Sequence, residues 1–227
     1  MRFSLVIAVF FLSMSSIAQK EVIDFDAVDS LYREDQFYLS LSYSNLQNPI
    51  SGFNQSKISA GISLGFLRDF PINKKRTWAV AAGLGYSYSG LNQNLGITEV
   101  NGENQYAIIT TEFNKNKLQL HYVDLPVEIR WRTSTPESHK FWRVYTGFKL
   151  SYLFYDQYKY DGLGIKTKQS GNDDLNKLQY GAYLAAGWNT WNVYVYYGLN
   201  PIFKSATIAS EPVKINAFTI GLMFYIL

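Results

Sequence analysis

The sequence predicts an all-β protein: an eight-stranded antiparallel up-and-down transmembrane β-barrel that follows an N-terminal signal peptide. Three observations lead to this fold class. Eight segments alternate apolar and polar residues, the links between them alternate long and short, and all five tryptophans stand beside short links. A period of two is typical of half-buried strands. Long loops at one rim, short turns at the other and aromatic girdles are features of outer-membrane barrels.

Residues 1–18 have the pattern of a secretory signal. Arg2 supplies a positive start, residues 3–12 are almost wholly apolar, and the segment ends on the small-x-small sequence Ser-Ile-Ala. About ten apolar residues are too few for a membrane-spanning helix, which needs about 20. We therefore expect cleavage, with an uncleaved anchor as the alternative. An acidic, flexible extension over 19–35 and the barrel over 36–227 would remain.

The composition excludes several classes of protein. The absence of cysteine excludes a disulfide scaffold and a thiolate metal site. A formal charge of +3 is too small to indicate a nucleic-acid partner. Aromatic residues make up 17% of the chain, which is high for a soluble domain but normal for a barrel with two girdles.

The first three predicted strands, 36–45, 57–67 and 77–89, each have one apolar face and one face of small residues. A soluble sandwich would place Lys, Glu or Thr on the second face. The interior of a narrow barrel explains Gly, Ala and Ser there, because about eight strands leave room only for side chains. The apolar faces are Phe37, Leu39, Leu41 and Tyr43; Ile58, Ala60, Ile62, Leu64 and Phe66; and Trp78, Val80, Ala82, Leu84, Tyr86 and Tyr88.

The next two predicted strands, 118–132 and 141–155, carry charged residues on the face opposite the apolar one. An unpaired buried charge costs several kcal/mol, so we expect an interior salt-bridge network that fixes strand register. A charged lumen that passes a small solute or a proton is the alternative, but wide aqueous channels have about 16 strands. The inward charges are Asp124, Glu128, Arg130, Arg132, Arg143 and Lys149.

The last three strands are predicted at 178–188, 191–200 and 214–227, and the links set the orientation. An even strand count with long outer loops places both barrel ends in the periplasm and the long loops outside the cell. The long links are 46–56, 90–116, 156–177 and 201–213, and the short ones are 68–76, 133–140 and Asn189-Thr190. Part of 90–116 is expected to extend its neighbouring strands as a hairpin.

The tryptophans predict a girdle at the periplasmic rim. Each one is in phase with the apolar face of its strand. Indole rings collect at membrane–water interfaces because the ring is apolar and its N–H prefers the wet side. The girdle residues are Trp78, Trp131, Trp142, Trp188 and Trp191.

Two features of strand 118–132 concern its backbone and chemistry. Pro126 cannot donate to a ladder, so it should mark a bulge or local break, and a phase change between Leu120 and Val123 points to a bulge nearby. His121 is out of phase with the inward set, His139 lies in a turn, and no Gly-x-Ser-x-Gly elbow occurs. We therefore expect no catalytic residue, no metal site and no cofactor.

The run Tyr122-Val123-Asp124-Leu125-Pro126 matches the Y-[LIV]-[DE]-[ILV]-P signature of the PorT-like outer-membrane β-barrel family of Bacteroidota. The following strand, 145–153, also resembles that family. The resemblance implies a small OmpA- or OmpX-like barrel in the outer membrane, with Tyr122, Asp124 and Pro126 as its motif residues. One family member is needed for type IX secretion, while most have no assigned activity.

The leading hypothesis is a non-enzymatic, monomeric barrel in outer-membrane lipid that serves as an accessory component of an envelope complex with a protein partner. The first alternative is an OmpX-like surface adhesion protein that acts through loops 90–116 and 156–177. The second is a lipid A-modifying enzyme that uses His121. A soluble lipocalin-like barrel is the rival fold; it would place Trp142 and Phe148 inside and the neighbouring charges outside.

Overall fold

The computed structural model describes residues 33–55, 57–133 and 141–226. The predicted signal peptide, most of the predicted extension and His139 lie outside these residues. Among the described residues, no helix has both the length and the hydropathy needed to cross a membrane. The strands are β1 (Gln36–Gln47), β2 (Ala60–Pro71), β3 (Trp78–Asn92), β4 (Leu95–Val100), β5 (Glu103–Ile108), β6 (Lys115–Arg132), β7 (Trp142–Gly162), β8 (Ile165–Ser170), β9 (Leu178–Trp188), β10 (Trp191–Gly198), β11 (Thr207–Ile208), β12 (Glu211–Pro212) and β13 (Asn216–Ile226).

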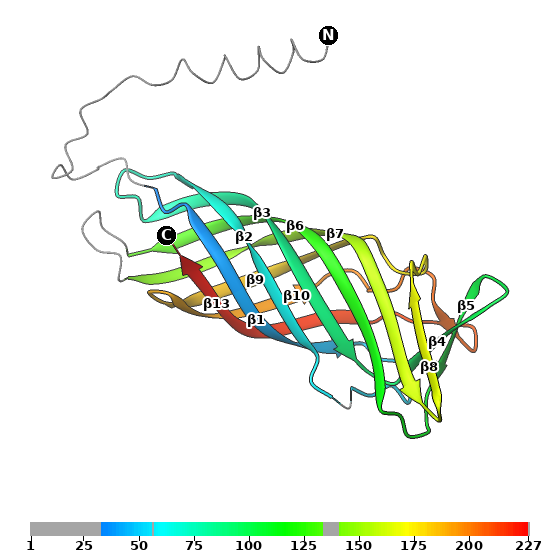
Figure 1. Ribbon diagram of the computed structural model, residues 1–227. Coiled ribbons are helices and arrows are strands. Elements are labelled where there is room, and N and C mark those ends of the chain that lie inside the picture. The colour runs from blue at the N-terminus through cyan, green and yellow to red at the C-terminus, as the bar shows by residue number, and fades with distance from the viewer. Residues whose placement is uncertain (1–32, 56, 134–140, 227) are drawn as a thin grey trace, which may run out of the picture. The chain divides into compact units, whose positions relative to one another are not determined.

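Eight of these strands close into an antiparallel barrel (Figure 1). The order around the barrel is β1, β2, β3, β6, β7, β9, β10 and β13, and the pairing of β1 with β13 returns the sheet to its start. Each strand therefore pairs with its neighbours along the chain once the small loop strands are set aside. This confirms the predicted eight-stranded up-and-down barrel.

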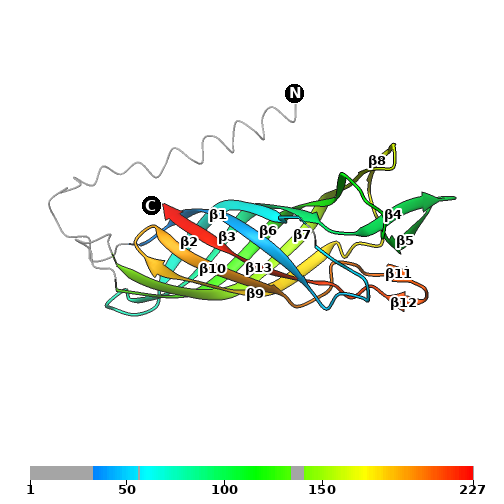
Figure 2. The ribbon, with the colours of Figure 1, turned by 90° about the horizontal axis from the view of Figure 1, so that it is seen from below.

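The two ends of the barrel differ in their connections (Figure 2). At the turn end, β1 begins, β13 ends, and short connections join β2 to β3, β6 to β7 and β9 to β10. At the loop end there are four longer connections, and three of them carry the small strands β4, β5, β8, β11 and β12. The link predicted at 90–116 does not simply prolong its neighbours: β4 and β5 form a separate two-stranded sheet.

The apolar face of the barrel points outward. On β6, Val127 and Ile129 are exposed to about half of their surface, at 50% and 53%, while the intervening Glu128 is buried. Phe148 and Trp142 are also exposed. The interior of a lipocalin would have the reverse arrangement, so that rival fold is wrong. Only a lipid surrounding stabilises such a continuous apolar outer surface.

Small residues on the inner face of β2 and β3 make room for a tyrosine of the neighbouring strand β1. A Cβ atom at Gly85 would lie 2.0 Å from the Tyr38 hydroxyl oxygen, and one at Gly65 would lie 2.7 Å from the Tyr38 ring. Tyr38 is buried together with Tyr194 and Tyr225 from β10 and β13. The interior is therefore filled in part by a tyrosine ring that lies across the glycines of the neighbouring strands.

The inner face changes phase once, on β7. Leu153 and Asp156 are both buried, while Phe154 and Tyr155 between them are both exposed. The register between β6 and β7 shifts at the same place: Tyr122 pairs with Leu153 and His121 with Tyr155. Phe154 therefore has no counterpart on β6. This is a β-bulge, and beyond it, toward the loop end, the inward-facing positions of β7 are shifted by one residue.

β6 itself keeps a single phase, so the predicted change between Leu120 and Val123 is wrong for that strand, whereas the bulge expected nearby is confirmed and lies on β7, opposite His121 and Tyr122. Leu118 and Leu120 point inward like Tyr122. They are apolar because the interior changes from polar to apolar toward the loop end. The sequence pattern misled because an inward leucine was interpreted as an outward one.

Pro126 interrupts the ladder on one side only. The register of β6 with β3 pairs Val127 with Ala82 and Asp124 with Gly85, and it skips the two positions between. On the other side Pro126 keeps its place opposite Lys149. The proline therefore causes a local break without a bulge, as expected from a residue that lacks an N–H donor.

Candidate functional site

The buried ion network near the turn end is centred on Asp69 of β2. Arg132 donates hydrogen bonds of 2.8 Å from both terminal nitrogens to the two Asp69 oxygens. Arg130 donates a third, of 3.0 Å. All three side chains are 0% exposed. Bidentate pairing gives this contact a fixed geometry, which suits a network that fixes β2 relative to β6 across the intervening strand β3.

The chain segment before β1 joins this network. The backbone carbonyl of Glu34 accepts a hydrogen bond from Arg130, and the Asp35 carboxylate accepts one from the Asp69 backbone. Glu34 is buried. Glu34 and Asp35, from the end of the region predicted as a flexible extension, thus join the network immediately before β1 begins.

Glu128 connects the network to the tyrosines on the opposite wall. Its Oε2 accepts a 2.7 Å hydrogen bond from Arg130 Nε, and its Oε1 accepts one of 2.8 Å from the Tyr183 hydroxyl. The Tyr225 hydroxyl also donates to Oε1, at 3.3 Å. The carboxylate therefore links β6 with β9 and β13 across the interior.

Arg143 differs from the predicted salt-bridge members. In the described part of the chain, no carboxylate lies within salt-bridge distance of it. Its guanidinium instead lies over the Phe141 ring, 4.5 Å from the centroid, and near the rings of Tyr145 and Tyr225. A weakly hydrated guanidinium is suited to such ring faces.

Asp124 and Lys149 form a second pair farther toward the loop end. Their charged atoms lie 3.4 Å apart, and the Ser151 hydroxyl donates a 2.6 Å hydrogen bond to Asp124. Lys149 also lies over the Tyr196 ring. The six residues predicted as one cluster are thus divided between the Asp69 network, this pair and the separate Arg143.

Asp69 and Glu34 were missed from the predicted cluster. Asp69 fell in a predicted turn because strand two was expected to end at residue 67, whereas β2 continues to Pro71. One signal could have located it: Asp69 is in phase with the inward Gly65 and Leu67. Glu34 gave no comparable signal because it precedes the first alternating run.

A cavity of about 70 Å³ lies within the barrel, next to Lys149 and Ser151. It has room for a few water molecules, and its polar lining could hydrogen-bond them. Buried leucines and aromatic rings pack on its loop side, and the Asp69 network fills the turn side. Its serine and threonine lining comes from Ser42, Ser44, Ser63, Ser87, Ser89, Ser151 and Thr219.

We expect the barrel to be closed to ions. The filled interior predicts no stepwise current when the purified protein is added to a planar lipid bilayer, because no continuous water path crosses the two packed layers. Single-channel recording at both voltage polarities checks this. Regular current steps from the wild-type protein would contradict the filled interior and restore the conducting-lumen alternative.

All five tryptophans lie at the turn end, on the outer surface. Trp78 and Trp131 are cross-strand partners, and Trp188 is the partner of both Trp142 and Trp191. Their exposed fractions run from 37% to 64%. The predicted girdle therefore forms one ring segment across β3, β6, β7, β9 and β10, at the height expected of a membrane interface.

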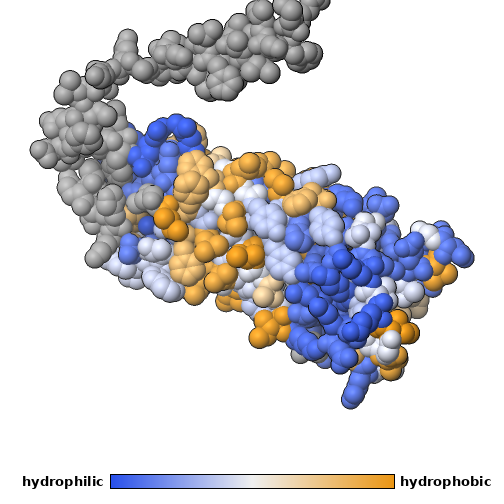
Figure 3. All heavy atoms as spheres, in the orientation of Figure 1, coloured by the Kyte–Doolittle hydropathy of each residue, from blue (hydrophilic) through white to orange (hydrophobic). Residues whose placement is uncertain are grey.

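A second aromatic group, the loop-side belt, consists of Tyr86, Tyr88, His121, Phe154 and Tyr155. A 2.8 Å hydrogen bond joins His121 Nδ1 and the Tyr86 hydroxyl. The other three rings lie within 5.1–6.2 Å of the His121 ring, between centroids. His121 is therefore a member of an outward-facing aromatic belt. In Figure 3 a hydrophobic band covers the middle of the barrel surface.

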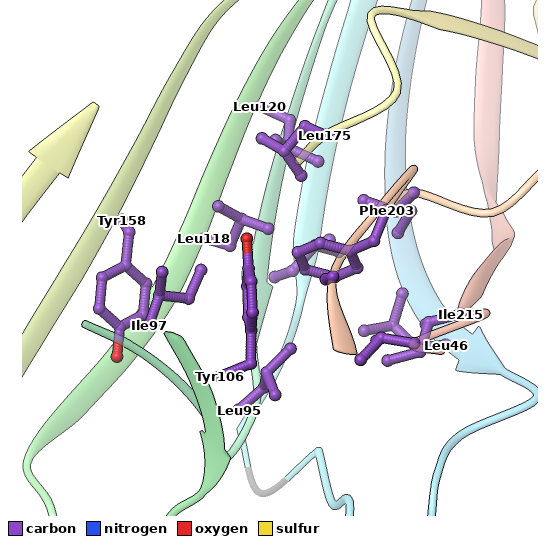
Figure 4. Packing of buried hydrophobic residues seen from close by; sticks show 14 of the residues in the cluster. Leu46, Leu95, Ile97, Tyr106, Leu118, Leu120, Tyr158, Leu175, Phe203 and Ile215 are labelled. Atoms are coloured by element: carbon purple, nitrogen blue, oxygen red, sulfur yellow. The ribbon is translucent and has the colours of Figure 1, made fainter. Parts of the chain in front are cut away.

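The loop connections form a head whose apolar core is continuous with inward residues at the loop end of the barrel (Figure 4). We call residues 93–114, 163–177 and 199–215 the loop head. Tyr106 of β5 packs edge-on against Phe203, with 5.7 Å between ring centroids. Leu175 and Ile215 are buried beside them. The head is thus an ordered unit, because it buries apolar residues from three separate connections.

An acidic cleft of about 540 Å³ separates hairpin β4–β5 from residues 169–174. The Tyr106 hydroxyl donates a 2.9 Å hydrogen bond to Asp174 at its edge. Burial raises the pKa of Asp174, but hydrogen bonds from Ser205 and Tyr106 outweigh it and hold that pKa below its usual value. This contribution to stability is present above the ordinary Asp pKa and is lost as the pH falls through the lowered pKa of Asp174. The acidic lining residues are Glu99, Glu103, Asp156, Asp173 and Asp174.

Replacing Phe203 with Ala should loosen the loop head and leave the barrel intact. Removing a buried phenylalanine costs about 3–5 kcal/mol, and here the loss falls on a core that the head shares with the loop end of the barrel but to which β2 contributes no residue. Hydrogen exchange should therefore show faster exchange in β4 and β5 but not in β2. Leu199→Ala, at an exposed position of the same connection, is the control. An equal loss of protection from hydrogen exchange in β2 would contradict the placement of the Phe203 core at the loop end, away from that strand.

The described residues hold no group of three or more His, Asp or Glu side chains placed to bind a metal ion. The Asn172-Asp173-Asp174 run contributes to the head instead. The Asn172 carboxamide nitrogen donates a hydrogen bond to the Tyr106 hydroxyl, and its oxygen accepts one from the Asp174 backbone.

Comparisons with known proteins give two similar solved structures and one matching family. Two crystal structures of Ail, the attachment invasion locus protein of Yersinia pestis, are similar at 13% identity, each covering 86% of this chain and 100% of that one. The complex with the heparin analogue sucrose octasulfate has a TM-score of 0.42, and the other structure 0.40. No curated protein matches the chain. A family model described as "Outer membrane protein beta-barrel domain" matches residues 17–204, so the chain belongs to this family of outer-membrane β-barrels.

Proposed function

We propose that this chain is a non-enzymatic accessory subunit of an outer-membrane complex, which the barrel anchors and the loop head connects to a protein partner. The folded head is the observation that carries the proposal. The barrel interior is filled and its outer face suits lipid, so the head is the part of the chain that offers a shaped polar surface. Binding residues are commonly carried by loops on a rigid scaffold.

The proposed orientation places the head outside the cell and the turn end in the periplasm. Outer-membrane barrels have long outer loops and short periplasmic turns, and the connections here follow that division. The tryptophan girdle would then lie at the inner interface and the loop-side belt at the outer one. A barrel of this kind needs no second copy to close its sheet, which supports a monomeric unit.

The PorT-like motif supports a secretion-related complex through family resemblance alone. Tyr122 and Asp124 point into the barrel, and Asp124 is engaged by Lys149 and Ser151. Pro126 breaks one ladder. The motif therefore has a structural task in this chain, and type IX secretion remains the proposed setting rather than a property of these residues.

Co-purification tests the accessory role. An affinity tag fits in the turn at Leu163 and Gly164, which is exposed and joins β7 to β8. Mild-detergent extraction of the native outer membrane should recover a stoichiometric protein companion. The double variant Glu99→Gln and Glu103→Gln, which neutralises two exposed residues of the acidic cleft, should lose it.

The matched control is Glu112→Gln with Glu211→Gln, which removes the same charge at exposed positions outside the cleft. The control should keep the companion. A wild-type barrel that is recovered alone, at every detergent concentration that keeps it folded, would contradict the accessory role. Equal loss from both variants would contradict recognition through the cleft.

A free-standing surface adhesion protein is the second candidate, and the edge of β8 favours it. Among the described strands, β8 pairs with β7 alone, so its other edge presents unpaired backbone groups to an incoming strand. Shortening the chain between Gly162 and Gly171 should then abolish attachment of cells to a protein-coated surface. Unchanged attachment would dispose of this candidate.

A further inference from the structure

Above the loop-side belt, the outer surface of β6, β7 and β8 carries a row of three lysines. Lys117 is the cross-strand partner of Lys159, and Lys159 is the partner of Lys168. They point away from the head core, because the adjacent Leu118 and Tyr158 are buried in it. In Figure 3 the surface over this end of β6, β7 and β8 is hydrophilic.

The next row carries two more positive charges. Asp161 of β7 stands between Lys115 and Lys166, which are its partners on the two neighbouring strands. Lys166 forms a 3.2 Å salt bridge with Asp161, but the lysine side chain is 80% exposed. Together the two rows hold five lysines and one carboxylate.

Three like charges directly opposite one another destabilise a sheet unless something neutralises them. Across the described positions of these two rows, Asp161 is the acidic side chain available, and it lies in the second row. Strands about 4.8 Å apart spread three amines over about 10 Å. An external anion that spans about 10 Å would neutralise all three amines of the row.

Lys117 is held toward the membrane side of the row. Its amine lies 5.7 Å from the centroid of the Tyr88 ring, in the loop-side belt. Gly90 makes this possible, because a Cβ atom there would lie 2.6 Å from Lys117 Cε and 2.7 Å from the Tyr88 hydroxyl. Gln119 donates to the same hydroxyl, at 2.7 Å. The aliphatic part of the Lys117 side chain therefore lies along the barrel wall, and its amine lies beside the Tyr88 ring of the loop-side belt.

The height of the row fits lipid headgroups. Lys117 is four residues from His121 along β6, which is about 14 Å of strand, or about 10 Å above the belt at a tilt near 40°. The aromatic belt itself lies at the membrane interface. Amines just above that interface, and one drawn back to it, meet phosphate groups of the surrounding lipid leaflet.

We propose that Lys117, Lys159 and Lys168, with Lys115 and Lys166 behind them, form a binding surface for the phosphate groups of a lipid headgroup on one side of the barrel. The bound species is a membrane lipid whose acyl chains lie against the apolar outer face of β6 and β7. The surface would select phosphorylated lipid and fix the rotational position of the barrel relative to it.

The test uses the full chain in phosphatidylcholine nanodiscs, with fluorescently labelled diphosphorylated lipid A as the probe. The variant Lys117→Gln, Lys159→Gln, Lys168→Gln should bind the probe about tenfold to a hundredfold more weakly than wild type, since each lysine near a membrane surface contributes about 1 kcal/mol. Binding to wild type should also weaken as salt rises.

The matched control is Lys74→Gln, Lys75→Gln, Lys214→Gln, which removes three exposed lysines that lie outside the row. Both variants are checked for the heat-dependent gel shift of a folded barrel. Equal weakening in the control, or none in the row variant, would overturn the proposal. Displacement of the probe by inorganic phosphate would also overturn it, because the site would then bind free phosphate and not a lipid.

Discussion

Replacing Asp69 with Asn should lower the free energy of unfolding by about 3–5 kcal/mol, the cost of breaking a buried ion pair by removing one partner. Asp69 accepts three hydrogen bonds from Arg130 and Arg132, and the arginines have no exposed surface through which to regain water. The charge of the carboxylate holds both guanidinium groups in the interior. Urea unfolding in lipid vesicles, followed by tryptophan fluorescence, measures the change.

Asp161→Asn is the matched control for that substitution. Asp161 also pairs with a cation, but the Lys166 side chain is mostly in water. Exposed ion pairs of this kind contribute about 0–1 kcal/mol. If both variants lower the free energy of unfolding by the same amount, the Asp69 network does not stabilise the barrel. Its charges would then not be buried ion pairs.

Replacing Leu125 with Arg should cost about 2–4 kcal/mol, which is the penalty for a cation on the lipid face at the bilayer midplane. Leu125 is half-exposed on β6, between His121 of the loop-side belt and Trp131 of the girdle. The same unfolding measurement in vesicles gives the value. The effect should disappear in a soluble fold, where an exposed arginine costs little.

Ile72→Arg provides the comparison by depth. Ile72 is as exposed as Leu125 or more, but it follows β2 at the turn end. A cation near the interface should cost only about 0–1 kcal/mol. Equal costs at the two positions would mean that the outer surface has no membrane-like depth profile.

The strands could be predicted from the sequence because successive residues of each strand alternate between an apolar outer face and a small or polar inner face. The alternation of Val127, Glu128 and Ile129 needs no partner strand to be interpreted. Interior contacts are different, since they depend on which residues meet across the closed sheet. Asp69 meets Arg132 from a strand that is 63 positions away, and nothing local to either residue indicates that pairing.

The loop head was beyond prediction for a similar reason. Its core joins Leu95, Tyr106, Leu175 and Phe203 from three connections, and none of these runs has a regular period. The leucines of β6 at 118 and 120 belong to the same core, which is why their direction was misread. The lysine row also needs the register of three strands before its members become neighbours.

A spin-label scan along β6 tests the central claim, a filled barrel whose apolar face meets lipid. The chain has no cysteine, so single cysteines at positions 122–131 can each carry one label without background. Odd positions should be accessible to oxygen, most strongly near residue 125, and even positions should be accessible to neither oxygen nor a water-soluble nickel reagent. Odd positions that respond to the nickel reagent along the whole strand would contradict a membrane barrel.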